Sequence, residues 1–206
     1  MSPRDQQKPK LPARLFRRGA LCCPNCKSQL EGKAAACSRC GFHFGLLDQQ
    51  MTGPGPSFSP LMDFTGIATA AQNDIETHAA RIRKSFPQVS PAVCFVNCPE
   101  GIPPQMLACW ILNHSPVNEN EDPTWRALLL IDPQRKQHSF SCGYQLETFI
   151  AREEIEALMD HAGESFYLEE WHAGAIKFLN GFFDLLRSSC EFAIKAEKEA
   201  RSQIKI

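Results

Sequence analysis

The sequence has no apolar run long enough to cross a bilayer. A spanning helix needs about 20 consecutive apolar residues, and no stretch of the 206-residue chain provides them. The N-terminal residues are polar and basic, without the apolar stretch of a secretory signal. These absences argue against a membrane span and favour a cytoplasmic location. The ten cysteines are therefore expected to be reduced thiols rather than disulfides.

The chain also has almost no net charge, but its charges are unevenly distributed. Residues 1–44 carry nine basic and two acidic side chains, whereas the remainder carries 13 basic and 21 acidic ones. A basic arm of this kind suits an acidic protein surface, nucleic acid or lipid headgroups, so peripheral membrane contact stays open. The alternative is a solubilising tail, or an arm lying against its own acidic domain.

Four of the cysteines are spaced as metal ligands in the segment CPNCKSQLEGKAAACSRC. Cys23 and Cys26 form one Cys-x-x-Cys turn, and Cys37 and Cys40 form a second. Two such turns present four sulfurs to one tetrahedral Zn²⁺. Cys22 is an alternative ligand to Cys23, although the symmetric spacing favours Cys23.

A module of this size is too small to fold without its metal. The segment resembles a zinc ribbon, and a closed set of four sulfurs predicts a structural site with no position for substrate. Phosphate or partner contacts are predicted at the surrounding basic residues: Arg14, Arg17, Arg18, Lys27, Lys33 and Arg39.

Composition divides the chain into five segments. These are a disordered basic leader (1–20), a zinc ribbon (21–45), a Pro/Gly linker (46–61), an α/β domain (62–190) and a charged helical tail (191–206).

The main domain alternates helical and strand patterns. Asn73 and Glu76 are expected to form a capping box at the start of a first helix, and AVCFVNC (92–98) reads as a buried strand. A second helix follows Pro103, then the strand RALLLID (126–132) and a half-buried strand at 136–143. Helical patterns continue to the end. This order predicts an α/β/α sandwich with a small mixed sheet.

The segments LMDFTGIAT, ALLLIDPQRKQHSFSCGYQLETFI and FYLEEWHAGAIKFLNGFFDLL together resemble a TPM domain, over about residues 61–187. The resemblance rests on the opening Asp, the central strand, the turn and the closing helix. The matching positions are Asp63, Leu128–Asp132, Gly143, Leu146, Glu147, Tyr167 and Gly174.

The resemblance implies an α/β/α domain with an acidic cleft that holds a divalent cation, and some TPM domains are reported as phosphatases. Here Gln145 and Arg152 stand where the family usually has Gly and Asp, which weakens that site. The candidate ligands for Ca²⁺ or Mg²⁺ are Asp63, Glu121, Asp122 and Glu147, with a solvated acidic rim as the alternative.

No catalytic residue is predicted. The leading hypothesis is a non-catalytic adaptor, or assembly and repair factor, in which the zinc ribbon and the TPM-like domain bind protein partners. The first alternative is a divalent-metal-dependent phosphatase that uses the acidic cleft. The second is a nucleic-acid-binding protein that uses the basic arm.

Overall fold

The computed structural model describes residues 22–30, 35–119 and 121–203. The predicted leader (1–20) lies outside these ranges, as do four of the six predicted contact residues: Arg14, Arg17, Arg18 and Lys33.

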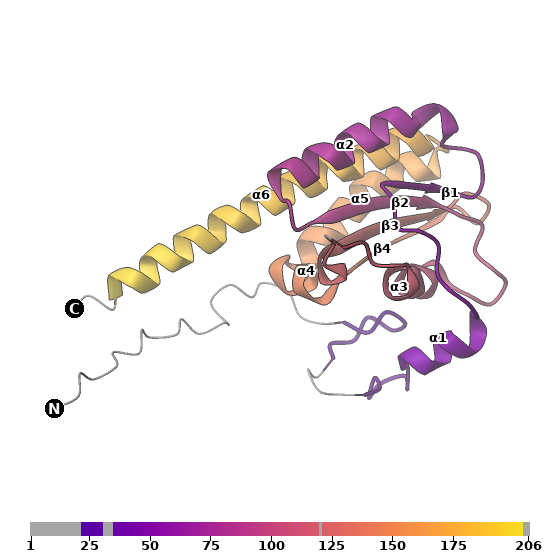
Figure 1. The fold of residues 1–206 in the computed structure, drawn as a ribbon, viewed down its shortest axis with the longest axis horizontal. Coiled ribbons are helices and arrows are strands. Elements are labelled where there is room, and N and C mark those ends of the chain that lie inside the picture. The colour runs from indigo at the N-terminus through magenta and orange to yellow at the C-terminus, as the bar shows by residue number, and fades with distance from the viewer. Residues whose placement is uncertain (1–21, 31–34, 120, 204–206) are drawn as a thin grey trace.

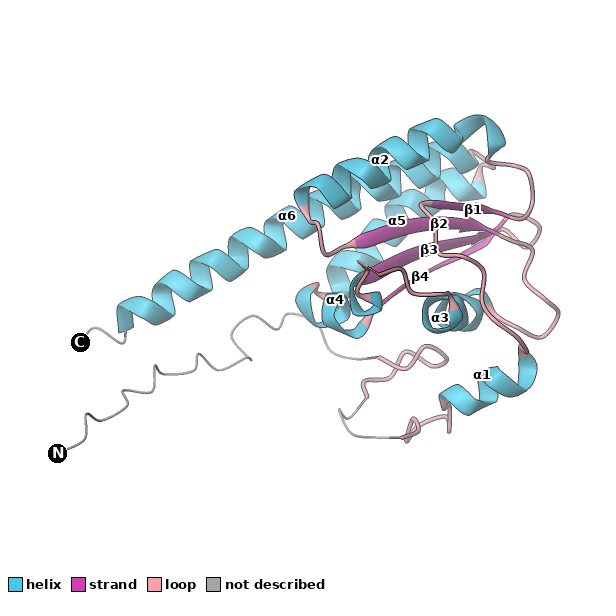
Figure 2. Ribbon diagram, viewed as in Figure 1, coloured by secondary structure: helices cyan, strands magenta, loops and turns pink. Residues whose placement is uncertain are grey.

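The chain is built around a small mixed sheet, as the sequence predicted, but the sheet has four strands rather than the three expected, because residues 61–63 add one more. The order is β1 (Leu61–Asp63), β2 (Ser90–Phe95), β3 (Arg126–Asp132) and β4 (Gln137–Cys142). β1, β2 and β3 are parallel, and β4 returns antiparallel to β3 (Figure 2). Every residue of β3 is buried, which explains why its sequence is an unbroken apolar run between two charged ends.

Helices cover both faces of the sheet, and the α/β/α sandwich is thereby formed (Figure 1). One face carries α2 (Gln72–Ser85), α5 (Arg152–Tyr167) and α6 (Trp171–Gln203). The other carries α3 (Pro104–His114), with α1 (Phe44–Gln50) and the cysteine module (residues 22–30 and 35–43) beyond it. Shorter elements connect them: the 3₁₀ turns Thr69–Ala71 and Pro123–Trp125, and α4 (Tyr144–Phe149).

Alternate residues of the strands separate the core into two halves. Val93, Leu129 and Ile131 pack toward α2, α5 and α6, where Phe178 and Phe182 are fully buried. Cys94, Leu128 and Leu130 point the other way, toward α3 and the cysteine module. This alternation is the two-residue period of a strand buried on both faces.

Three local expectations need correction. Helix α2 begins at Gln72 after Ala71, and no side chain caps it; the predicted capping box at Asn73 is wrong, and Glu76 instead accepts a hydrogen bond from Gln72. The linker predicted over 46–61 opens with most of α1, whose Leu47 is fully buried. The predicted tail is helical through Gln203, but it is continuous with the domain, because α6 runs unbroken from Trp171.

None of the helices within the described ranges is long and apolar enough to cross a membrane.

Candidate metal centre

The two Cys-x-x-Cys turns have the same backbone structure. In the first, Lys27 N–H donates to Cys23 O and Cys23 N–H donates to Ser28 O. In the second, Gly41 N–H donates to Cys37 O and Cys37 N–H donates to Phe42 O. Lys27 (φ 60°) and Gly41 (φ 71°) occupy the same left-handed position. The repetition shows that the equal spacing in the sequence encodes two equivalent knuckles.

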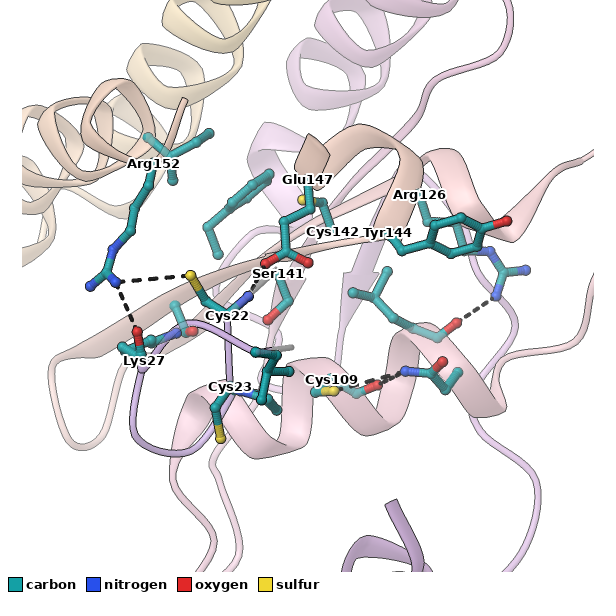
Figure 3. A pocket seen from close by; sticks show the side chains of 18 of the residues that line it. Cys22, Cys23, Lys27, Cys109, Arg126, Ser141, Cys142, Tyr144, Glu147 and Arg152 are labelled. Carbon is teal, nitrogen blue, oxygen red and sulfur yellow. Dashed lines mark hydrogen bonds between the residues drawn. The ribbon is translucent and has the colours of Figure 1, made fainter. Parts of the chain in front are cut away.

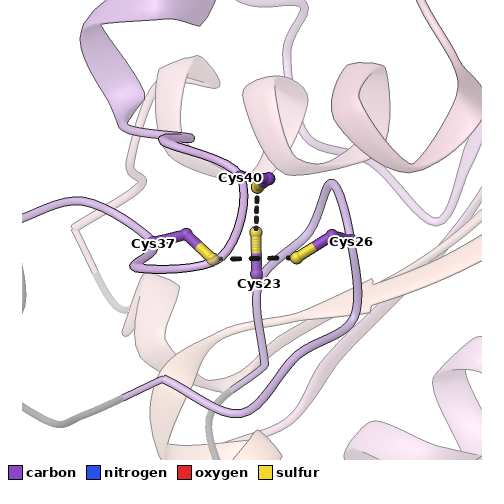
Figure 4. Close-up of side chains that lie close together, drawn as sticks. All are labelled: Cys23, Cys26, Cys37 and Cys40. Atoms are coloured by element: carbon purple, nitrogen blue, oxygen red, sulfur yellow. Dashed lines mark hydrogen bonds between the residues drawn. The ribbon is translucent and has the colours of Figure 1, made fainter.

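The knuckles face each other and bring four sulfurs together (Figure 4). Sγ of Cys23 lies 3.6 Å from Sγ of Cys40, and Sγ of Cys26 lies 3.7 Å from Sγ of Cys37. All four atoms lie within 4.8 Å of one another. A tetrahedron with Zn–S bonds of about 2.3 Å has edges of about 3.8 Å, so the sulfur arrangement fits such an ion.

Hydrogen bonds prepare two of these thiols to ionise. The Ser28 hydroxyl lies 3.3 Å from Cys37 Sγ and, with the amides of Cys40 and Arg39, lowers the pKa of Cys37 to about 6. Ser28 also lowers the pKa of Cys26. Burial instead raises the pKa of Cys23 to about 12. A coordinated cation deprotonates its thiol ligands, so it would overcome this burial cost.

The cluster is therefore compatible with a structural metal such as zinc. Four sulfur donors complete a tetrahedron and suit a soft ion better than Ca²⁺ or Mg²⁺, which prefer oxygen. No coordination position remains for substrate. Cys22 lies next to the cluster but does not belong to it.

The module is attached to the α/β domain by polar contacts at both ends of its first knuckle (Figure 3). Cys22 N–H donates to Glu147 Oε1 at 2.7 Å, and Arg152 Nη1 donates to Lys27 O at 2.8 Å. Burial raises the pKa of Glu147. Beneath these bonds, Phe42 and Leu47 share one apolar cluster with α3. The module therefore packs on the domain as part of one core.

Each of the four predicted carboxylate ligands has another role. Asp63 accepts hydrogen bonds from the backbone amides of Thr65, Gly66 and Ala68; although burial opposes it, these bonds lower the pKa of Asp63. Asp122 caps the turn at Thr124, which lowers the pKa of Asp122.

Glu121 forms a two-bond ion pair with Arg126, at 2.8 and 2.9 Å. The Arg126 side chain is fully buried and also donates to the carbonyls of Leu112, Ser115 and Pro116. Burial opposes the shift, but the guanidinium lowers the pKa of Glu121. Among the described residues the cysteines alone form a cluster of three or more metal-ligating side chains, so Asp63, Glu121, Asp122 and Glu147 are not brought together.

Sequence reasoning missed both the attachment through Glu147 and Arg152 and a cavity of about 810 Å³ beside it. The cavity lies between the module, α3, α5 and β4. Of the basic residues predicted to contact a partner, Lys27 lines this cavity and Arg39 is exposed on the second knuckle.

No family model matches the chain, and no curated protein is similar to it at a significant level. Solved structures are similar. The N-terminal domain of a protein from P. gingivalis superimposes with a TM-score of 0.51 and 18% identity, over 66% of this chain and 86% of that domain. The N-terminal domain of the cg2496 protein from Corynebacterium glutamicum gives 0.49 and 17%, over 65% and 84%. The P. gingivalis likeness is one of fold alone.

Proposed function

We propose that this protein is a non-catalytic adaptor in which a zinc-bound cysteine module and an α/β domain together present a protein-binding surface. The closed set of four sulfurs carries the proposal, because it leaves no coordination position for a substrate. The metal then serves to hold the knuckles in place.

The state of the acidic residues supports a binding role over the phosphatase alternative. A hard cation needs about six oxygen ligands, and the four candidate carboxylates serve separately as a loop acceptor, a turn cap, an ion-pair partner and an acceptor for Cys22.

We also propose that the α/β domain is related to TPM domains. The observed order β1, α2, β2, α3, β3, β4, α4, α5, α6 follows the order of that family. Gly143 supports the turn assignment, because a Cβ there would lie 2.3 Å from Thr124 O, so only glycine fits.

The adaptor proposal is tested by metal analysis combined with cross-linking mass spectrometry. The full chain is purified, its zinc content is measured, and it is cross-linked in native lysate. One zinc per chain is expected, with cross-links to the same protein partners concentrated on residues 22–45 and on the neighbouring α5 surface.

The matched variants leave all four cysteines of the cluster in place. Lys27→Glu with Arg39→Glu reverses two charges on the knuckles, and Arg83→Glu with Arg187→Glu reverses two on exposed helix positions elsewhere. Loss of partners in the first pair alone supports the proposal. Equal partner recovery in all forms, or turnover of a phosphomonoester that requires added Mg²⁺ or Ca²⁺, contradicts it.

A further inference from the structure

Strand β4 forms one edge of the sheet, and part of its backbone is unpaired. Gly143 N–H donates to Arg126 O, which fixes the alternation of hydrogen-bonded and non-hydrogen-bonded pairs along β3 and β4. The N–H and C=O groups of His138, Phe140 and Cys142 therefore point away from β3. Within the described part of the chain, these groups have no backbone partner.

The unpaired edge borders the large cavity. Seven consecutive residues, 138–144, line it, and such an unbroken run places the backbone edge itself, rather than one face, at the cavity wall. One side of the cavity is formed by Cys109 and Leu112 of α3, and the other by Ile155 and Met159 of α5. The first knuckle stands opposite (Figure 3).

Charged side chains lie at both ends of the cavity, and at one end Lys27 lies beside Glu147, which accepts a hydrogen bond from Cys22 N–H. Lys27 is close enough to act electrostatically on Cys142 and Glu147, at the end of β4, whereas Asp160 acts on His138, near its start. In the described structure neither the Lys27 ammonium nor the Asp160 carboxylate has an ion-pair partner within 4.0 Å. Besides Glu147, which is occupied by the Cys22 amide, the cavity therefore offers Lys27 at one end of the strand and Asp160 at the other.

We propose that this cavity binds an extended peptide segment of a partner protein, which adds to β4 as a fifth strand. The proposal rests on the adaptor function above and names the chemistry of its partner. A strand edge supplies main-chain hydrogen bonds for affinity, and pockets on alternate sides supply specificity. An unpaired edge is also a surface that a protein otherwise has to protect.

The side chains that line the cavity determine the sequence and length of the peptide that fits it. Both faces of the added strand meet apolar side chains, one from α3 and the other from α5. Consecutive central residues of the peptide are therefore all small and apolar, without the usual alternation with polar residues. β4 has six residues, and a strand of this length spans about 20 Å. The peptide carries an acidic residue beside Lys27 and a basic residue beside Asp160. When antiparallel to β4, its acidic end is the N-terminal one.

The test uses displayed heptapeptide libraries and the full chain. One library has Glu first, Lys last and mixtures of Val, Ile, Ala, Ser and Thr between them; the second has the two charged residues exchanged. Enriched peptides are made synthetically and added to ¹⁵N-labelled protein. Amide exchange at His138, Phe140 and Cys142 is expected to slow at least tenfold, while Ser139 and Ser141, already paired with β3, change little.

Two matched controls distinguish strand addition from nonspecific peptide binding. The same peptide with N-methyl groups at alternate residues keeps every side chain but loses its ladder donors, and it is expected to bind at least tenfold more weakly. The double variant Lys27→Glu, Asp160→Lys is expected to favour the library with exchanged charges. Asp184→Lys with Arg187→Glu, which reverses an exposed ion pair on α6, leaves the preference unchanged.

Several results would overturn the proposal. One is that neither library yields a peptide, and another is that the enriched peptides slow amide exchange elsewhere than on β4. Deletion of residues 1–20 alone speeds exchange at the three amides, which assigns the groove to the chain's own N-terminal segment. Slower exchange at higher protein concentration assigns it to a second copy. Each of these can occur while the cross-links between this chain and its protein partners persist, so failure of the peptide does not imply failure of the adaptor.

Discussion

The cysteine module and the α/β domain lie against each other but are stabilised by different means. The domain buries two apolar clusters on the faces of its sheet, whereas the module contributes few apolar side chains and gathers four sulfurs instead. The pattern shows how a segment with almost no core of its own becomes part of a folded body. A structural metal would fix its backbone, and Phe42 together with Leu47 of the adjoining helix α1 completes the core of its neighbour.

The largest difference between the module and the domain is expected when the metal is removed. Structural zinc contributes about 10–16 kcal/mol in small modules, so a strong chelator or Cys37→Ser is expected to abolish amide protection in residues 22–30 and 35–43. Strand β3 and helix α6 are expected to stay protected. Hydrogen exchange measures both, and Cys190→Ser, a half-buried cysteine on α6, is the control. Protein purified without zinc, or unaffected by chelation, would show that the module folds by other means.

The reciprocal change weakens the domain and spares the module. Phe182 is fully buried and packs against Phe140 and Phe178. Phe182→Ala is expected to lower the free energy of unfolding by about 3–5 kcal/mol without changing zinc content. Urea titration and metal analysis measure the two quantities. Leu168→Ala, at a largely exposed position, should have little effect; similar losses in both variants would mean that this aromatic cluster contributes no special stability.

An intermediate effect is expected at the buried ion pair of the domain. Glu121→Gln removes the charge from hydrogen bonds to Arg126 and should cost about 1.5–3 kcal/mol at neutral pH. Because pairing lowers the folded pKa of Glu121 below its unfolded value, this stabilisation is present above about pH 4.3 and is lost as the pH falls through the folded pKa.

Urea midpoints measured from pH 7 to pH 3 provide the check. The variant should approach the parent at low pH, and Glu119→Gln, two residues away and exposed, should follow the parent throughout. A constant gap between parent and Glu121→Gln across the range would mean that the charge of Glu121 is not what stabilises the loop.

The smallest effects compare the two knuckles directly. A Cβ at Gly41 meets nothing within 4 Å, so Gly41→Ala isolates the backbone cost of the left-handed position, about 1–2 kcal/mol. Lys27→Gly relieves the same cost in the first knuckle and should stabilise it by up to about 1 kcal/mol. Competition with a zinc chelator should show weaker binding in the first variant and tighter binding, up to about fivefold, in the second. Changes of equal sign would mean that the knuckles are not equivalent.

Much of this architecture follows from local sequence patterns. The cysteine spacing predicted the cluster, because two equal Cys-x-x-Cys turns can close only on each other. The run RALLLID predicted a central strand, because a strand covered on both faces has no polar alternation. The mixed sheet between helical layers followed from the order of these elements.

Long-range pairing could not be read in this way. Nothing near Glu147 or Arg152 indicates that they meet residues 22 and 27, more than 120 positions earlier. Arg126 appeared to be the charged start of a strand, but its side chain is buried. Hydrogen bonds to Glu121 and three carbonyl groups offset the cost of desolvating its guanidinium. The acidic residues were grouped by resemblance, but the fold places Asp63, Glu121 and Asp122 beside local partners and Glu147 beside the distant Cys22 amide. Helix α1 was missed because Pro and Gly dominate the segment that follows it.

Helix α6 has a mechanical consequence. Its 33 residues form a rod about 50 Å long, of which the first part is clamped between α2 and α5 (Figure 1). Its last fully buried side chain is Ser189, so the remaining turns project from the body like a pointer. The projecting part is about 21 Å long, so a tilt of about 10° where the helix leaves the body would move its tip by about 4 Å. A spin label near Ser202 would therefore magnify small rearrangements of the apolar interior into displacements that are easily measured.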